Sequence, residues 1–169
     1  MLLVSGFNGL GLATIVSLPR LFGQQFRNVV FVGVAEVDSA QLKGPEEVEH
    51  LEQQVADDLV EYCRFASDLG FYPELRGGIG PDVAFELYRM CIGVANEFPK
   101  AVFFAGKLVF ANELDGYISR FLHNHTALEL QGRLQAQGLS LVILPVRVMS
   151  SRERPKALAP AAAPLAAGG

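Results

Sequence analysis

The stretch RNVVFVGVAEVDS, residues 27–39, decides the fold. Its apolar residues follow one another almost without interruption, and many of them are β-branched. A half-exposed strand alternates apolar and polar residues, whereas a strand that is buried on both faces reads as a continuous apolar run. Parallel sheets that carry helices on both faces are built from such strands. The stretch therefore predicts an α/β domain.

Helix and strand patterns alternate after this stretch. Apolar residues recur at spacings of three and four in segments 44–70, 81–99 and 114–138, which predicts helices. Strand patterns cover segments 71–80, 100–112 and 139–148. Pro73 indicates that the first of these strands lies at the edge of the sheet. The alternation predicts a small, mostly parallel sheet of about four strands with helices on both faces. We expect these four strands to lie in the order 2-1-3-4.

The two ends of the chain differ from this middle part. Residues 1–19 carry no charge, but glycines and polar residues make them too polar for a convincing membrane span. We expect residues 1–26 to form a helical junction, either amphipathic or the end of a transmembrane helix. Residues 27–148 are then the cytoplasmic α/β domain, and the Pro/Ala-rich residues 149–169 are a disordered tail.

The junction contains a glycine motif, SGFNGLGLAT (5–14), which suggests a dinucleotide-binding loop. Only two residues separate Gly6 from Gly9-x-Gly11, where a short-chain dehydrogenase has three, and position 12 is Leu12 where GxxGxxG needs glycine. Each glycine of such a loop serves one turn or one close approach to the pyrophosphate, so a shift of one residue matters. No tyrosine has a lysine four residues later. Asp38, an acidic residue after the next strand, keeps the dinucleotide interpretation open.

Composition excludes several other kinds of site. The net charge is −4 and the basic residues are scattered, so the electrostatic footprint of a nucleic-acid-binding protein is missing. Cys63 and Cys91 are far apart in the sequence and read as ordinary thiols in helices. His123 and His125 are two residues apart, which places them on different sides of a helix and argues against a shared metal. We expect no catalytic residue, no metal and no cofactor.

If a ligand site exists, it lies beyond the carboxyl ends of the strands. RGGIGPD (76–82) suggests a tight connection in which glycine permits positive φ, next to a helix start that can hold an anion. His123 and Asn124 can point towards a ligand or a partner. The candidate ligand-binding residues are Asp38, Gly78, Gly80, Lys107, Asn112, His123, Asn124 and Arg147.

Several separated blocks, taken in order, are familiar. They are RLFGQQFRNVVFVGVAEVDS (20–39), KGPEEVE (43–49), EFPKAVFFAGKLVF (97–110), LHNHTALELQGRLQAQGL (122–139) and VILPVRV (142–148). They resemble the soluble C-terminal region of bacterial amino acid permeases of the amino acid–polyamine–organocation (APC) transporter family. The similarity runs from about residue 9 to residue 148. This chain departs from the family pattern at Gly23, where the family tends to have proline, and at His125, where it tends to have glutamate.

The resemblance implies a fold similar to that of the universal stress proteins. It also implies a place on the cytoplasmic face of the inner membrane after the last transmembrane helix, with the permease core as partner, and a homodimer. No transport residue can be carried over, because those residues lie in membrane helices. The phosphate loop of ATP-binding stress proteins, GxxG-x9-G[ST], is missing from the corresponding segment, GKLVFANELDG (106–116).

The expected function is therefore a soluble regulatory or structural domain of an amino acid permease, without catalysis of its own. One alternative is a stand-alone nucleotide-binding module similar to stress proteins. Another is an NAD-dependent oxidoreductase that uses Gly6, Gly9 and Gly11.

Overall fold

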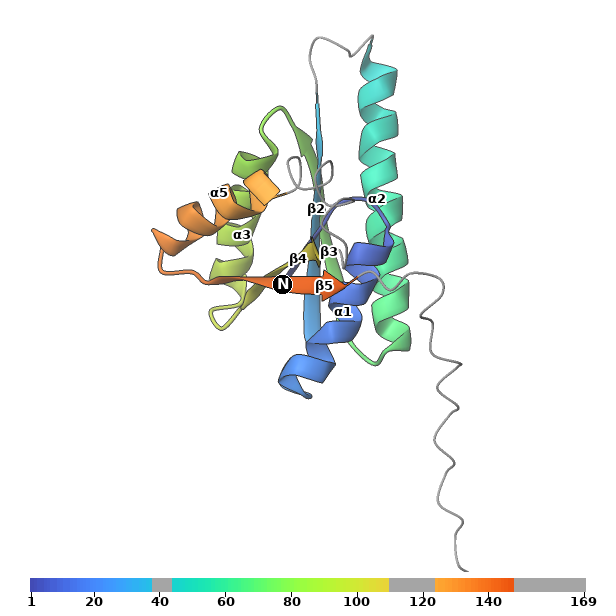
Figure 1. Cartoon of the computed structure of the whole chain (residues 1–169). Helices are drawn as coiled ribbons and strands as arrows, with labels where there is room; N and C mark the ends of the chain where they lie inside the picture. The colour runs from blue at the N-terminus through green and yellow to red at the C-terminus, as the bar shows by residue number, and fades with distance from the viewer. Residues whose placement is uncertain (38–43, 110–123, 148–169) are drawn as a thin grey trace, which may run out of the picture.

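Five parallel strands form the middle layer of the molecule (Figure 1). The computed structural model describes residues 1–37, 44–109 and 124–147. The strands are β1 (Leu2–Val4), β2 (Asn28–Glu36), β3 (Tyr72–Gly80), β4 (Phe103–Val109) and β5 (Leu141–Arg147). They lie in the order β3-β2-β1-β4-β5, and every neighbouring pair is parallel. The predicted α/β class with a parallel sheet is confirmed.

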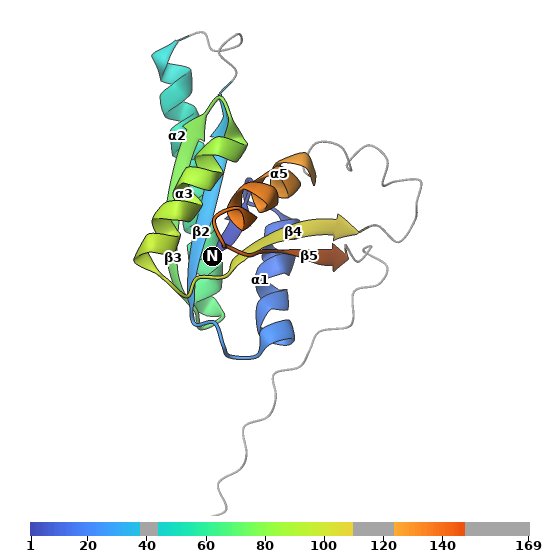
Figure 2. The same ribbon diagram turned by 90° about the vertical axis from the view of Figure 1, so that its left-hand side faces the viewer.

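Helices cover both faces of this sheet, as Figures 1 and 2 show from two sides. Helices α1 (Gly9–Phe22) and α2 (Pro45–Asp68) pack on one face, around Leu2, Phe31 and Tyr62. Helices α3 (Val83–Glu97) and α5 (Asn124–Gln135) pack on the other, around Val32 and Phe103. The sheet thus separates two apolar clusters, which is why the residues of β2 are buried on both sides.

The predicted strand count and order were wrong because of β1. The four predicted strands, now β2, β3, β4 and β5, keep their order relative to one another. β1 is an additional strand that lies between β2 and β4. Leu2 pairs with Phe31 of β2 on one side and with Phe104 of β4 on the other. A strand of three residues is too short to show a period, so its position could not be seen in the sequence.

The prediction that residues 1–26 are a junction ahead of the domain is corrected by the same strand. These residues supply the central strand of the sheet and helix α1, so they are part of the domain itself. Their lack of charge has a simple cause: Leu2 and Ile15 are completely buried. In the described part of the chain, no helix is both long and apolar enough to cross a membrane.

Helix α1 lies unusually close to β4. A Cβ atom on Gly106 of β4 would be 2.2 Å from Thr14 Oγ1 and 3.0 Å from Leu10 Cδ1. Thr14 is itself buried, and its hydroxyl donates a hydrogen bond to the carbonyl oxygen of Leu10 at 2.7 Å. Gly106 therefore makes room for the helix.

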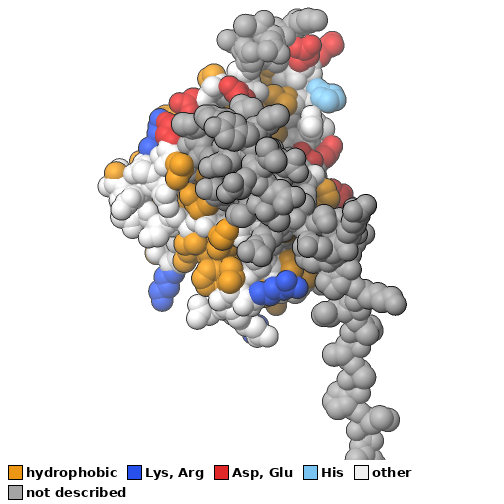
Figure 3. All heavy atoms as spheres, viewed as in Figure 1, with side chains coloured by type: hydrophobic (Ala, Val, Ile, Leu, Met, Phe, Trp, Pro, Cys, Tyr) orange, Lys and Arg blue, Asp and Glu red, His pale blue; other side chains and the backbone are white. Residues whose placement is uncertain are grey.

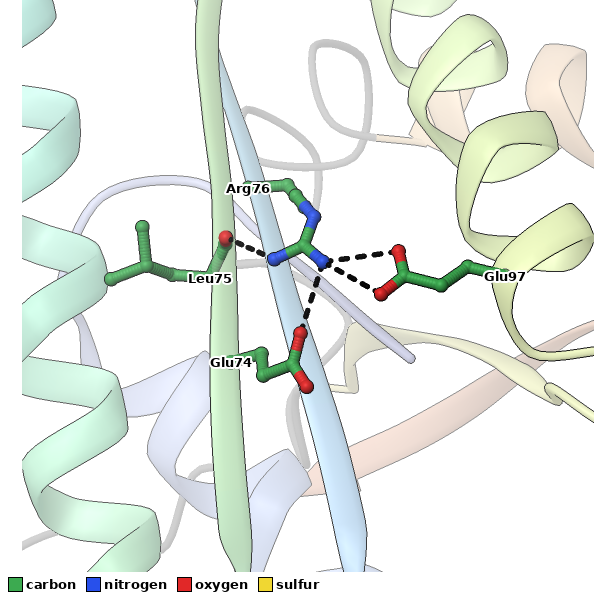
Figure 4. A network of polar contacts seen from close by, with 4 residues as sticks. All are labelled: Glu74, Leu75, Arg76 and Glu97. Carbon is green, nitrogen blue, oxygen red and sulfur yellow. Dashed lines mark hydrogen bonds and ion pairs between the residues drawn. The ribbon is translucent and has the colours of Figure 1, made fainter.

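Strand β3 lies at the edge of the sheet, as Pro73 predicted. The amide of Tyr72 donates to Arg27 O, and Gly80 O accepts from Val37, so the even-numbered residues of β3 bond to β2. Pro73 then faces outward, where its missing N–H costs no ladder hydrogen bond. Figure 4 shows Arg76 donating to the outward Leu75 carbonyl at 2.9 Å and pairing with Glu74 and Glu97. These side chains leave fewer backbone groups on the edge for another strand.

The remaining boundaries follow the sequence closely. The predicted helices 44–70 and 81–99 correspond to α2 and α3, and α3 begins after Asp82, whose carboxylate accepts from the amide of Phe85 at 2.9 Å. Of the predicted helix 114–138, the structure describes α5. The predicted disordered tail, 149–169, lies outside the described residues.

The amino group of Met1 gives the 169-residue polypeptide a testable pH dependence. It donates to Val102 O at 2.7 Å, and burial lowers its pKa from 8.0 to about 6. Burial also raises the pKa of the neighbouring Cys91 thiol to about 12, so that group stays neutral. Because the unfolded chain binds the proton more tightly, stability should rise between pH 6 and 8. Below that window the free energy of unfolding should be lower by about 2–3 kcal/mol.

Urea unfolding of the unmodified and the N-terminally acetylated polypeptide, at several pH values, measures this contribution. The two polypeptides differ only at this amino group, so the difference between their pH profiles isolates the amine. If the free energy of unfolding depends on pH identically in the two polypeptides, burial does not destabilise the charged form of the amine.

Candidate functional site

The loop between β1 and α1, residues 5–8, lies where a ligand is most expected. Helices α1 and α2 connect strands on one face, and the chain then crosses β1 to build β4 and β5 on its other side. In doubly wound sheets, ligands bind at this change of direction, beyond the carboxyl ends of the strands. The loop also carries the first part of the glycine motif.

Asn8 occupies the amino end of α1. Its backbone is extended, and its Oδ1 accepts hydrogen bonds from the amides of Leu10 at 3.0 Å and Gly11 at 3.1 Å. Its Nδ2 donates to the carbonyl oxygens of Ser5 and Gly6. The amides that would hold a phosphate at a helix start are therefore already bound to a side chain of the protein.

Tyr62 of α2 holds the same loop from the other side. Its hydroxyl donates to Gly6 O at 2.8 Å and accepts from the amide of Asn8 at 3.1 Å. Its ring is fully buried, stacked against Phe31 and touched edge-on by Phe7. Burial raises the pKa of Tyr62, so the phenol remains a neutral donor.

The three glycines of the motif SGFNGLGLAT (5–14) have different structural roles. Gly6 has φ of 61°, a conformation that favours glycine. Gly11 makes room for Tyr62, because a Cβ atom there would be 2.0 Å from its hydroxyl oxygen. Gly9 has nothing within 4 Å of its Cβ position. The close approach that the motif permits is thus to a side chain of this protein.

A small pocket adjoins the loop. It has a volume of about 120 Å³ and is lined by residues of β1, the β1–α1 loop, β2 and α2, among them Ser5, Gln54, Asp58 and Tyr62. Pockets for small molecules usually measure about 300–1,000 Å³. The carboxylate of Asp58 lies beside Gly6, 3.8 Å from where a Cβ atom would be, and it would repel a phosphate. The pocket suits a few water molecules better than a dinucleotide.

The predicted site residues separate into distant groups. Gly78 and Gly80 belong to β3, whereas Lys107 and Arg147 belong to β4 and β5. Since β3 and β4 are three places apart in the sheet, about 14 Å separates those strands. Asn124 is the first residue of α5. The side chains of Lys107, Asn124 and Arg147, and the whole of Asp38, Asn112 and His123, lie outside what the structure describes.

The glycines of β3 are also explained by packing. A Cβ atom on Gly78 would be 2.5 Å from Met90 Cε, and one on Gly80 would be 2.6 Å from Glu86 Cγ. Both contacts are with helix α3. The expectation that glycine here permits positive φ was wrong, because these residues are strand residues without positive φ. They let α3 approach the sheet.

Sequence reasoning missed the two residues that hold the loop, Asn8 and Tyr62, and it missed Asp58 beside Gly6. Asn8 had a usable signal, since an asparagine directly before an apolar run is a common helix cap. Tyr62 lies within the predicted helix 44–70, where an aromatic residue fits the apolar spacing. Nothing in a single sequence shows that it would meet a loop 54 residues away. Among the described residues, no cluster of His, Cys, Asp or Glu could hold a metal ion.

The fold and this loop together define a class: an α/β domain with a doubly wound parallel sheet whose β1–α1 loop is held by its own side chains. No family model, no curated protein and no solved structure matches the chain.

Proposed function

We propose that this chain is a regulatory or structural C-terminal domain of an amino acid permease of the APC family. It lies on the cytoplasmic face of the inner membrane, has a fold similar to that of the universal stress proteins, and catalyses no reaction of its own. Its partners are the transmembrane core of the same polypeptide and a second copy of the domain. It needs no cofactor for this role.

One observation carries the proposal: the β1–α1 loop is filled from within. Asn8 caps the first amides of α1. The Tyr62 hydroxyl donates a hydrogen bond to Gly6 O and accepts one from the Asn8 amide. In nucleotide-dependent enzymes of similar topology, the cofactor supplies these contacts. The polar groups of this loop are hydrogen-bonded without a ligand. This supports the proposal that the domain acts by binding another part of a protein.

The blocks that resemble the permeases support the same function. They coincide with the end of α1, with β2, with the start of α2, and with β4, α5 and β5. These elements include three of the five strands, β2, β4 and β5, and helix α5. The resemblance therefore spans several separated elements of the domain and is much broader than a single motif.

Cell fractionation tests the proposal directly. Antiserum raised against the 169-residue chain should detect a protein much larger than 18.3 kDa in the inner-membrane fraction. Protease added to inverted vesicles should remove the epitope, and protease added to right-side-out vesicles should leave it intact. Deleting the domain from the gene should change amino acid uptake without removing the protein from the membrane. A soluble protein of about 18 kDa as the sole product would overturn the proposal.

The strand order favours one second candidate, a stand-alone nucleotide-binding module. Its ligand would reach the carboxyl ends of β4 and β5, where Lys107 and Arg147 lie. Calorimetry with ATP, ADP, AMP and NAD distinguishes it from the first proposal. We expect no heat at high micromolar concentration. A heat that disappears in Lys107→Ala or Arg147→Ala would instead support the nucleotide module.

A further inference from the structure

The seven Lys and Arg side chains that the structure describes divide into two groups. Arg64, Arg76, Arg89 and Arg133 each pair with a glutamate at 2.7–3.1 Å. Arg20, Arg27 and Lys100 are exposed, and none of them makes an ion pair with any residue that the structure describes. Cations that lack an internal partner are available to an external anion.

The three unpaired cations share one end of the molecule, which we call the amino edge. Arg20 lies in the last turn of α1, Arg27 directly precedes β2, and Lys100 lies just before β4. Because β2 and β4 are parallel, their starts lie at the same edge of the sheet. Arg27 and Lys100 line one groove of about 670 Å³, together with Met1 and Phe98. In Figure 3, Lys and Arg side chains mark the lower end of the view, and most Asp and Glu side chains lie higher.

Large apolar side chains are exposed at the same edge. Leu21 is 61% exposed, Leu69 is 46% exposed and Tyr72 is 66% exposed. Leu69 and Tyr72 share a second groove with Arg27. Tyrosine together with Lys and Arg is the composition found where proteins meet the headgroup layer of a membrane. The acidic neighbours are Asp68, which ends α2, and Glu97, whose carboxylate is already paired with Arg76.

We propose that the amino edge binds the surface of a bilayer that contains anionic phospholipid. The inference rests on the proposed function, because there the permease core precedes Met1, and Met1 lies at this edge. A domain that enters from the membrane at its basic edge turns its acidic end, with Glu46 and Glu47 at the start of α2, towards the cytoplasm. Each Lys or Arg close to an anionic surface strengthens binding about fivefold, and the effect fades within about 10 Å at 0.1 M salt.

Co-sedimentation of the 169-residue chain with lipid vesicles tests this inference. The probes are vesicles of phosphatidylcholine alone and vesicles that also contain phosphatidylglycerol. The chain should pellet with the second kind only, and added salt should release it. The variant Arg20→Gln/Arg27→Gln/Lys100→Gln should bind about a hundredfold more weakly.

The matched control is Arg64→Gln/Arg89→Gln/Arg133→Gln, which changes the net charge equally but removes only paired cations. It should bind like the unchanged chain, and circular dichroism checks that both variants fold. If both variants bind the vesicles equally weakly, or if the unchanged chain does not bind phosphatidylglycerol vesicles, the inference is overturned. The amino edge would then be a surface for a protein partner. A large membrane protein in the fractionation experiment combined with no vesicle binding rejects this inference alone. Vesicle binding by a soluble protein of about 18 kDa rejects only the permease assignment.

Discussion

A polypeptide that lacks residues 1–26 should not fold. Its sheet would lose the central strand β1, and β2 would no longer be joined to β4. It would also lose the buried side chains of Leu2, Ile15 and Leu18. Burial of each such side chain stabilises a protein by about 2 kcal/mol, so the sum is comparable with the net stability of a whole domain. Circular dichroism and thermal unfolding of residues 27–169 should show no cooperative transition.

Complementation in trans provides the control for this truncation. A synthetic peptide of residues 1–26 should restore cooperative unfolding when it is mixed with the truncated chain. The same peptide carrying Leu2→Asp should not, because Leu2 is completely buried between β2 and β4. A truncated chain that melts cooperatively on its own would mean that residues 1–26 are indeed an appendage.

Gly11→Ala should destabilise the protein by about 3 kcal/mol, at the upper end of the range for overpacked sites. The new methyl group would overlap the Tyr62 hydroxyl, which cannot move away without breaking its hydrogen bonds to the loop. Gly9→Ala is the matched control two residues earlier in the same helix. Its Cβ position is open, so this substitution should be neutral or stabilise by about 0.5–1 kcal/mol. Urea unfolding of the two variants measures both effects.

A double variant identifies what requires the glycine. Tyr62→Leu removes the hydroxyl and the end of the ring, so Gly11→Ala should cost much less in that background than in the unchanged protein. Full stability of Gly11→Ala alone would refute the packing explanation. In that case a ligand outside the protein would again be the best reason for the glycine.

Much of the fold could be predicted from local patterns. The apolar run around Phe31 identified β2, the helical spacing from Leu51 to Leu69 identified α2, and Pro73 placed β3 at the edge. β1 could not be predicted, because a three-residue strand has no measurable period and its neighbouring glycines read as a junction. Its position depends on contacts with Phe31 and Phe104, which are far away in the sequence.

The candidate site was harder to predict than the fold. Glycine has no side chain, so its sequence position cannot show whether a ligand or a neighbouring residue takes up the space. Gly11, Gly78 and Gly80 all face side chains of helices, namely Tyr62, Met90 and Glu86. Their partners are set by the tertiary packing of α2 and α3 against the sheet, which a single sequence does not contain.

The central position of β1 has a consequence for synthesis on the ribosome. Within this domain, β1 is translated before the other strands and can pair with β2 soon afterwards, but its other neighbour, β4, begins at Phe103. Until then, the second edge of β1 and the side chains of Leu2 and Phe31 are without their final cover. Non-local pairing of this kind slows folding and exposes apolar surface to aggregation. The core of the nascent domain therefore stays incompletely covered until β4 has been translated.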